Sequence, residues 1–214
     1  MNWLRIPLLA ALTAFAATLL FIPGSQAAGP ASLAVTVKQP NGLPVKDAVV
    51  MVYPKLGVPA GPIRFGWKSE MGQSNITFTP GTLIVPAGAT VRFPNYDKVR
   101  HSIYSFSKAA TVDIQLYGRD ETRTHTFAVA GSVALGCKIH DKMRGYIKIV
   151  DTPYAAKTDH NGQVRISQLP GGAATLKIWH PALRSRTGEQ VGAVTLAPGA
   201  VAAHAVTAEL RPLQ

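Results

Sequence analysis

Short runs rich in Val, Ile, Thr and Phe, broken by Gly, Pro or Asn every eight to twelve residues or so, restrict the fold of this chain most strongly. No long amphipathic helical pattern follows the apolar N-terminal segment. Regular turn signals between short β-type runs are typical of β-sandwiches. The sequence therefore predicts an all-β fold, with residues 33–38 and 48–54 among its strands.

The character of the sequence changes near residue 67 and again after residue 151. The block 67–151 is long enough for one sandwich. The flanking segments, 28–66 and 152–214, each hold too few strands to bury a core alone. We therefore expect them to pair into a second, smaller sandwich that is split around the central block.

The N-terminus has the order of a secretory signal peptide. One basic residue, Arg5, precedes an apolar run over residues 6–22, a Pro-Gly break, and small residues at positions 25 and 27. The alternative is an uncleaved anchor, but this run lies at the lower edge of what spans a bilayer. We expect residues 1–27 to be removed, leaving a periplasmic or otherwise exported protein that does not span the membrane.

The chain is basic, with 22 Lys and Arg against 11 Asp and Glu and a formal net charge of +11. An exported protein rarely meets nucleic acid, so we expect no nucleic-acid partner. Acidic proteins or anionic envelope surfaces are the expected counterparts of this charge. The alternative is a generally solvated basic surface.

The single cysteine, Cys137, carries the strongest chemical signal. In an oxidising compartment a lone cysteine is an inert thiol, half of an intermolecular bridge, or a metal ligand. Its spacing favours the last reading, because His140 follows after three residues and Met143 after three more. Cys137 also shares strand parity with Val133 and Leu135, which places its thiol on the inward face at a strand end.

A second histidine is expected to join this group from another strand. His101 shares parity with Val99 and Ile103, so its ring should point inward. Two imidazoles, a thiolate and a thioether form the donor set of a blue copper site, whereas structural zinc sites rarely use methionine. The predicted metal ligands are His101, Cys137, His140 and Met143.

These residues resemble the cupredoxins, and the short Cys-x-x-His-x-x-Met spacing is similar to that of the amicyanin-like members. The upstream part of the resemblance consists of Phe78, Thr79, Pro80, Val85, Gly88, Val91, Phe93, Asn95, Asp97 and His101, and the downstream part of Cys137, His140, Met143 and Gly145. Two positions depart from the family pattern. Ser102 stands where an asparagine often braces the ligand loops, and Leu135-Gly136 where an aromatic often precedes the cysteine.

The segments VRHSIYSFS, LGCKIHDKM and VDTPYAAKT, together with WHP, also resemble exported proteins of the methylamine utilization protein type. That resemblance implies a cupredoxin Greek-key sandwich at 67–151 beside a carboxypeptidase-regulatory-like sandwich formed by the two flanking segments. It also implies one mononuclear type 1 copper ion.

The resulting expectation is a one-electron carrier rather than an enzyme, because the chain has no recognisable catalytic arrangement beside the copper motif. Three basic residues, Lys138, Lys142 and Arg144, interleave with the ligands and are expected to dock an acidic redox partner, such as a c-type cytochrome or a dehydrogenase. The alternatives are a periplasmic copper chaperone or storage protein and a non-redox envelope binding module.

Overall fold

The computed structural model describes residues 29–212, so the predicted signal peptide lies outside the described residues. Within this range the chain forms sixteen strands and no helix, which confirms the predicted all-β sandwich fold. Consequently, residues 29–212 include no helix with the length and hydrophobicity needed to cross a membrane.

The central sandwich is built from residues 72–150. Its larger sheet has the order β5-β11-β10-β7-β8. The facing layer pairs β3 with β4 and β6 with β9. Two isolated bridges link these pairs, from Glu70 before β3 to Arg92 within β6 and from Gln73 in β3 to Asn95 just after β6. The bounds are β3 Gly72–Ser74, β4 Thr77–Thr79, β5 Thr82–Pro86, β6 Ala89–Pro94, β7 His101–Ser107, β8 Ala110–Tyr117, β9 Thr122–Phe127, β10 Gly131–Cys137 and β11 His140–Val150.

The flanking sandwich, as we call the second unit, takes its strands from both sides of the central one in sequence. Its sheets have the orders β13-β1-β16 and β12-β2-β14-β15. The bounds are β1 Ala31–Lys38, β2 Val49–Pro54, β12 Ala155–Lys157, β13 Gln163–Leu169, β14 Gly172–Trp179, β15 Glu189–Leu196 and β16 Val201–Thr207. Strand β1 pairs antiparallel with β13 and parallel with β16, so residues 31–54 and 155–207 share both sheets.

Alternation of side chains explains how the central core forms. In β10, Val133, Leu135 and Cys137 are buried while Ser132 and Ala134 are exposed, as the shared parity of the apolar positions predicts. The same rule makes one face of β1 a wall of the flanking core. Each sandwich thus has its own cluster of buried aliphatic and aromatic side chains.

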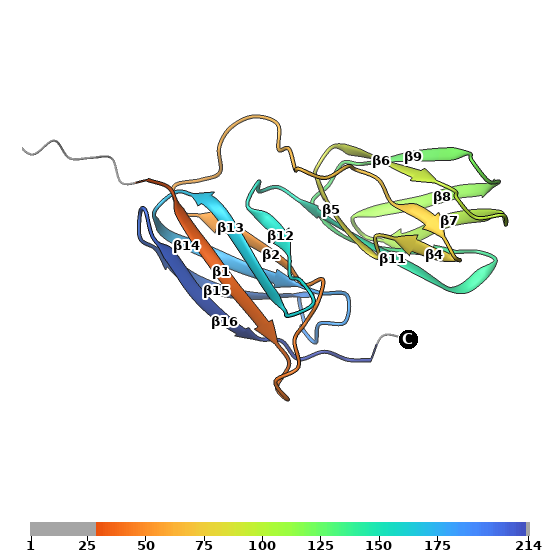
Figure 1. Ribbon diagram of the computed structural model, residues 1–214. Coiled ribbons are helices and arrows are strands. Elements are labelled where there is room, and N and C mark those ends of the chain that lie inside the picture. Colours follow the sequence, from red (N-terminus) through yellow and green to blue (C-terminus); the bar gives the residue numbers. More distant parts are fainter. Residues whose placement is uncertain (1–28, 213–214) are drawn as a thin grey trace, which may run out of the picture.

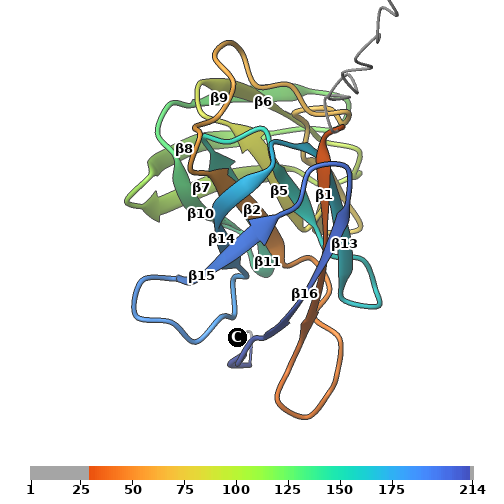
Figure 2. The ribbon, with the colours of Figure 1, turned by 90° about the vertical axis from the view of Figure 1, so that its left-hand side faces the viewer.

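A third buried cluster joins the two sandwiches, which lie end to end in Figure 1 and one behind the other in Figure 2. Ile84 and Val150 from the central sandwich pack with Val49, Met51 and Trp179 from the flanking one. The junction therefore buries apolar surface of both units, and burial of this kind is the main favourable term in the packing of domains.

An ion pair lies beside this junction. The Nζ atom of Lys148 on β11 donates to Glu189 Oε1 on β15 at 2.6 Å and lies 5.6 Å from the ring centroid of Trp179. The side chains of Lys148 and Glu189 are 5% and 21% exposed. Lys177 approaches the other carboxylate oxygen at 3.4 Å, and the Tyr53 ring lies 5.0 Å from the Lys177 amine. Burial raises the pKa of Glu189, but the two lysines outweigh it and hold this pKa below its usual value.

We expect Glu189→Gln to lower the free energy of unfolding by about 2 kcal/mol at pH 7, because it leaves the buried Lys148 ammonium without its counter-ion. Since the folded-state pKa of Glu189 is depressed, its contribution is present above the usual glutamate pKa and is lost as pH falls through the folded value. The free energies of unfolding of the native protein and of Glu189→Gln, measured in urea, should therefore converge at acid pH. The control Lys177→Gln, at a side chain that is 35% exposed, should cost under about 1 kcal/mol. Equal losses from the two variants would contradict this account.

Candidate metal centre

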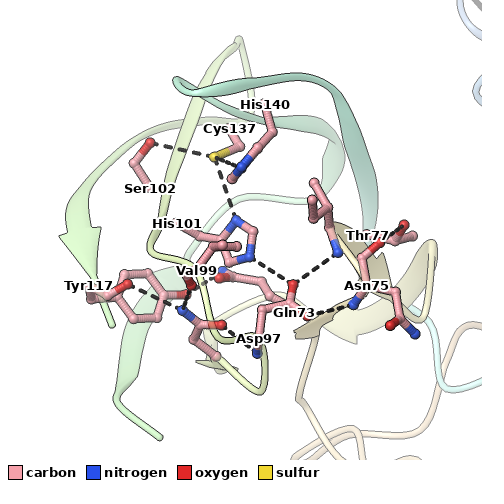
Figure 3. Close-up of polar contacts among 12 residues, drawn as sticks. Gln73, Asn75, Thr77, Asp97, Val99, His101, Ser102, Tyr117, Cys137 and His140 are labelled. Atoms are coloured by element: carbon pink, nitrogen blue, oxygen red, sulfur yellow. Dashed lines mark hydrogen bonds and ion pairs between the residues drawn. The ribbon is translucent and has the colours of Figure 1, made fainter. Parts of the chain in front are cut away.

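Three predicted ligands meet at one end of the central sandwich. His101 begins β7, Cys137 ends β10 and His140 begins β11. Their ligand atoms all lie within 4.8 Å of one another. The Sγ atom of Cys137 is 3.9 Å from His101 Nδ1 and 3.6 Å from His140 Nδ1, and Figure 3 shows both rings turned toward the sulfur.

A tight connection between β10 and β11 brings two of these donors together. Only Lys138 and Ile139 separate the strands, and Cys137 pairs directly with His140 across a register shift that follows Gly136. The sequence predicts a strand end at Cys137, and β10 does end at that residue. The next strand, β11, begins only three positions later, at His140. Antiparallel pairing at a hairpin end places the two side chains side by side, with no long loop needed to fold back.

The orientation of His101 is set by Asp97. The Nε2 atom of His101 lies 2.8 Å from Asp97 Oδ2, so a neutral ring that donates its Nε2 proton keeps its Nδ1 lone pair toward the sulfur. The carboxylate also accepts hydrogen bonds from the backbone N–H groups of Asn75 at 2.6 Å and Ile76 at 2.9 Å. Figure 3 shows this chain of contacts running from the β3–β4 turn to the thiol.

These contacts keep the Asp97 carboxylate charged. Burial raises the pKa of Asp97, but the hydrogen bonds from Ile76, His101 and Asn75 outweigh it and place this pKa below its usual value. Asn75 and Ile76 both have φ of 54°, a conformation that is strained for a β-branched residue such as Ile76. The turn holds this strain where its two N–H groups point at the carboxylate, a placement typical of functional sites.

Asn95 fixes the segment that leads from β6 to His101. Its Nδ2 group donates to the carbonyl oxygens of Val99 at 2.9 Å and Tyr117 at 3.2 Å. Its Oδ1 atom accepts the backbone N–H of Asp97 at 2.9 Å. Because Asn95 is fully buried, these bonds hold the position of Asp97 rigidly beneath His101.

The structure gives Ser102 a bracing role in place of the asparagine of the cupredoxin pattern. Its Oγ atom accepts the backbone N–H of Lys138 at 3.0 Å and lies 3.8 Å from Cys137 Sγ. The side chain therefore ties β7 to the β10–β11 turn. At the other departure, a Cβ atom on Gly136 would lie 2.7 Å from the ring of Tyr104 on β7, so this ring occupies the space over Gly136.

The remaining predicted residues lie around this cluster. Met143 is buried in the same core cluster as Cys137. His140 is half-buried, and Lys138, Lys142 and Arg144 are exposed. Lys138 Nζ pairs with Asp113 at 2.5 Å, so part of its charge is neutralised within the molecule.

Sequence reasoning included Asp97 in a motif but missed its contact with His101, and it left the role of Ser102 open. The available signals were the spacing of four residues between Asp97 and His101, and a polar residue directly after the histidine.

No family model matches this chain, and no curated protein matches it. Among solved structures it is similar to a purple cupredoxin from Nitrosopumilus maritimus, with 20% identity and a TM-score of 0.36 over 39% of this chain and all of the other. A reduced variant of amicyanin matches at 19% identity and a TM-score of 0.36, over 49% of this chain and 99% of the other. A copper-containing nitrite reductase from Thermus scotoductus matches at 24% identity and a TM-score of 0.38, over 42% of this chain and 25% of the other. Because these identities are below 25% and these TM-scores below 0.5, the chemistry of the site has to be judged from its own geometry.

The geometry fits a mononuclear copper ion. Two imidazole nitrogens and one thiol converge from three strand ends, and this N₂S set is the strong-donor set of type 1 copper sites. The centre is mostly buried, since His101 and Cys137 are at most 3% exposed.

We expect Ser102→Ala to lower the free energy of unfolding by about 1–3 kcal/mol, because the Lys138 N–H loses its acceptor. Ser107→Ala is the matched control, since Ser107 lies on the same strand and its Oγ accepts the Ala134 N–H at 3.0 Å away from the cluster. Both variants should lose stability in urea. Only Ser102→Ala should speed the reaction of the metal-free Cys137 thiol with a disulfide reagent. Equal thiol reactivity in the two variants would show that Ser102 does not protect the site.

Proposed function

We propose that this protein is an exported type 1 copper protein of the cupredoxin class that carries one electron at a time between envelope redox partners. The observation that carries the proposal is the convergence of one ligand atom each from His101, Cys137 and His140, all within 4.8 Å of one another. Burial of the thiol and the first imidazole supports it, because a dry, preformed site suits a metal that changes its charge without changing its ligands.

His101, Cys137 and His140 would hold the copper as strong ligands, and Met143 would be a weak fourth ligand. Bound copper supplies the change between Cu(I) and Cu(II) that stores and releases the electron. Asp97 keeps the His101 lone pair directed at the metal position, and Ser102 keeps the Cys137 turn against β7. Because each of the three strong ligands begins or ends a strand of one sheet, the protein holds these donors in place through the redox cycle.

The proposed route for the electron passes through His140, the most exposed of the three donors. Lys142 and Arg144 are exposed beside it and have no ion-pair partner among residues 29–212, in contrast to Lys138. Their charge supports docking of an acidic partner such as a c-type cytochrome or a dehydrogenase. The methylamine utilization resemblance and the predicted signal peptide make an envelope location part of the same proposal.

The visible spectrum of the mature protein with one equivalent of Cu(II) tests the proposal. We expect an intense thiolate-to-copper band near 600 nm (roughly, for a site with these ligands) that is reversibly bleached by reduction and absent in Cys137→Ser. Exchangeable Cu(I) binding without a blue Cu(II) form would instead support a copper chaperone or storage protein. Failure to bind copper in either state would leave a non-redox binding module.

The role of Met143 can be tested in the same way. Met143→Leu should keep the blue band but raise the reduction potential, because loss of a sulfur donor disfavours Cu(II). Met71→Leu is the matched control, since Met71 is equally buried in the same core cluster and both changes conserve volume. An equal potential shift in the two variants would assign Met143 to packing alone.

Inorganic oxidants test the docking surface without a known partner. Oxidation of the reduced protein by ferricyanide should slow as salt rises, because the anion is attracted to Lys142 and Arg144. Lys142→Gln should weaken this salt dependence. Lys46→Gln should preserve it, because Lys46 is an exposed lysine between β1 and β2 of the flanking sandwich. An oxidation rate that does not change with ionic strength would contradict docking at Lys142 and Arg144.

A further inference from the structure

A cavity of about 640 Å³ lies at the junction of the two sandwiches. It is bounded by β4 and β5, by β12 of the flanking sandwich, and by the segment 67–70 that leads into β3, and Figure 1 shows the connection from β2 to β3 crossing between the units. Its lining contains none of the proposed metal ligands. The lining residues are Trp67, Lys68, Glu70, Thr79, Pro80, Thr82, Leu83, Ile84, Ala156 and Lys157.

Trp67 forms a rigid aromatic wall of this cavity. Its Nε1–H group donates to the carbonyl oxygen of Ile84 at 2.9 Å, and its ring stacks on Phe65 with centroids 4.5 Å apart and planes 7° apart. Trp67 nevertheless remains 43% exposed. A tryptophan that is fixed at two points yet left partly uncovered offers a preformed apolar surface to a ligand.

The rest of the lining is mainly apolar. Pro80 and Ala156 lie on it, and Leu83 and Ile84 are almost fully buried residues that reach it from β5. Concave, mostly apolar sites at domain junctions with a few polar groups are the usual setting for small-molecule binding. An aromatic wall and an aliphatic lining favour a flat ring.

The charged side chains of the lining indicate which charge a bound aromatic ligand should have. Glu70 pairs with Arg92 at 3.1 Å, and Lys157 pairs with Asp47 at 2.8 Å and donates to Thr82 O at 2.7 Å. Lys68 is exposed and has no carboxylate within ion-pair distance among residues 29–212. The unbalanced charge at the mouth of the cavity is therefore positive.

We infer that this cavity binds a small planar aromatic compound with one anionic group, its ring against Trp67 and its anion at Lys68. The inference goes beyond the proposed electron carriage and does not depend on copper, because the ligand contacts neither His101 nor Cys137. Its binding energy comes from buried ring surface, and Lys68 supplies the preference for an anion over a neutral analogue.

The test uses 2-naphthoate as the probe and 2-naphthamide as its neutral counterpart, titrated into the metal-free and the copper-loaded mature protein. In ¹H–¹⁵N spectra, naphthoate should shift the Trp67 indole Nε1–H and the Leu83 and Ile84 amides saturably, with the same affinity in both forms. Lys68→Gln should weaken naphthoate binding about fivefold and leave naphthamide binding unchanged. Lys55→Gln, at an exposed lysine of the same connection outside the lining, should change neither.

Equal affinity of the native protein for the two probes, or an unchanged naphthoate affinity in Lys68→Gln, would overturn the inference. So would shifts that never saturate or that occur away from Trp67. Because Lys68 is exposed, its replacement leaves the fold intact, and an unchanged thermal unfolding midpoint verifies this. Failure of this test leaves the metal proposal unaffected, since that proposal depends on the copper spectrum.

Discussion

The pairing of Cys137 with His140 across the β10–β11 turn is the constraint on which the rest of the structure depends. It sets two donors side by side without a loop, and the Lys138 N–H bonded to Ser102 then attaches this turn to β7, which carries His101. This hydrogen bond and the pairing of β7 with β10 therefore hold the third donor beside the first two. A shift of register by one residue would turn the thiol out of the core, because side chains alternate between faces.

Strand β11 extends this constraint through the molecule. It begins at His140, pairs in parallel with β5, and ends in the junction with the flanking sandwich, where Lys148 meets Glu189 and Val150 enters the shared cluster. The donor cluster and the junction thus lie at opposite ends of one continuous strand. The flanking sandwich consequently adds packing to the strand that holds the metal position, and the junction forms the aromatic cavity beside β5.

Charged side chains inside the protein and those on its surface have different roles. These contacts of the Asp97 carboxylate are within the protein: it accepts hydrogen bonds from two backbone N–H groups and contacts His101. Many of the basic side chains remain outside. Buried charge therefore orients groups within the protein, and exposed charge is available to select partners by long-range attraction.

The sequence by itself determined the all-β class, because period-two alternation and frequent turn residues exclude a helical core. It also placed Cys137 and His140 close together, since residues only three positions apart at a strand end cannot lie far from each other. The tertiary structure decided what distant segments do to each other. The bonds from Asn75 and Ile76 to Asp97 span more than twenty residues, and the contact of Ser102 with Lys138 spans 36. The meeting of Lys148 with Glu189 spans 41 residues and two sandwiches. Such contacts depend on strand order and on the placement of two cores, and local propensity encodes neither.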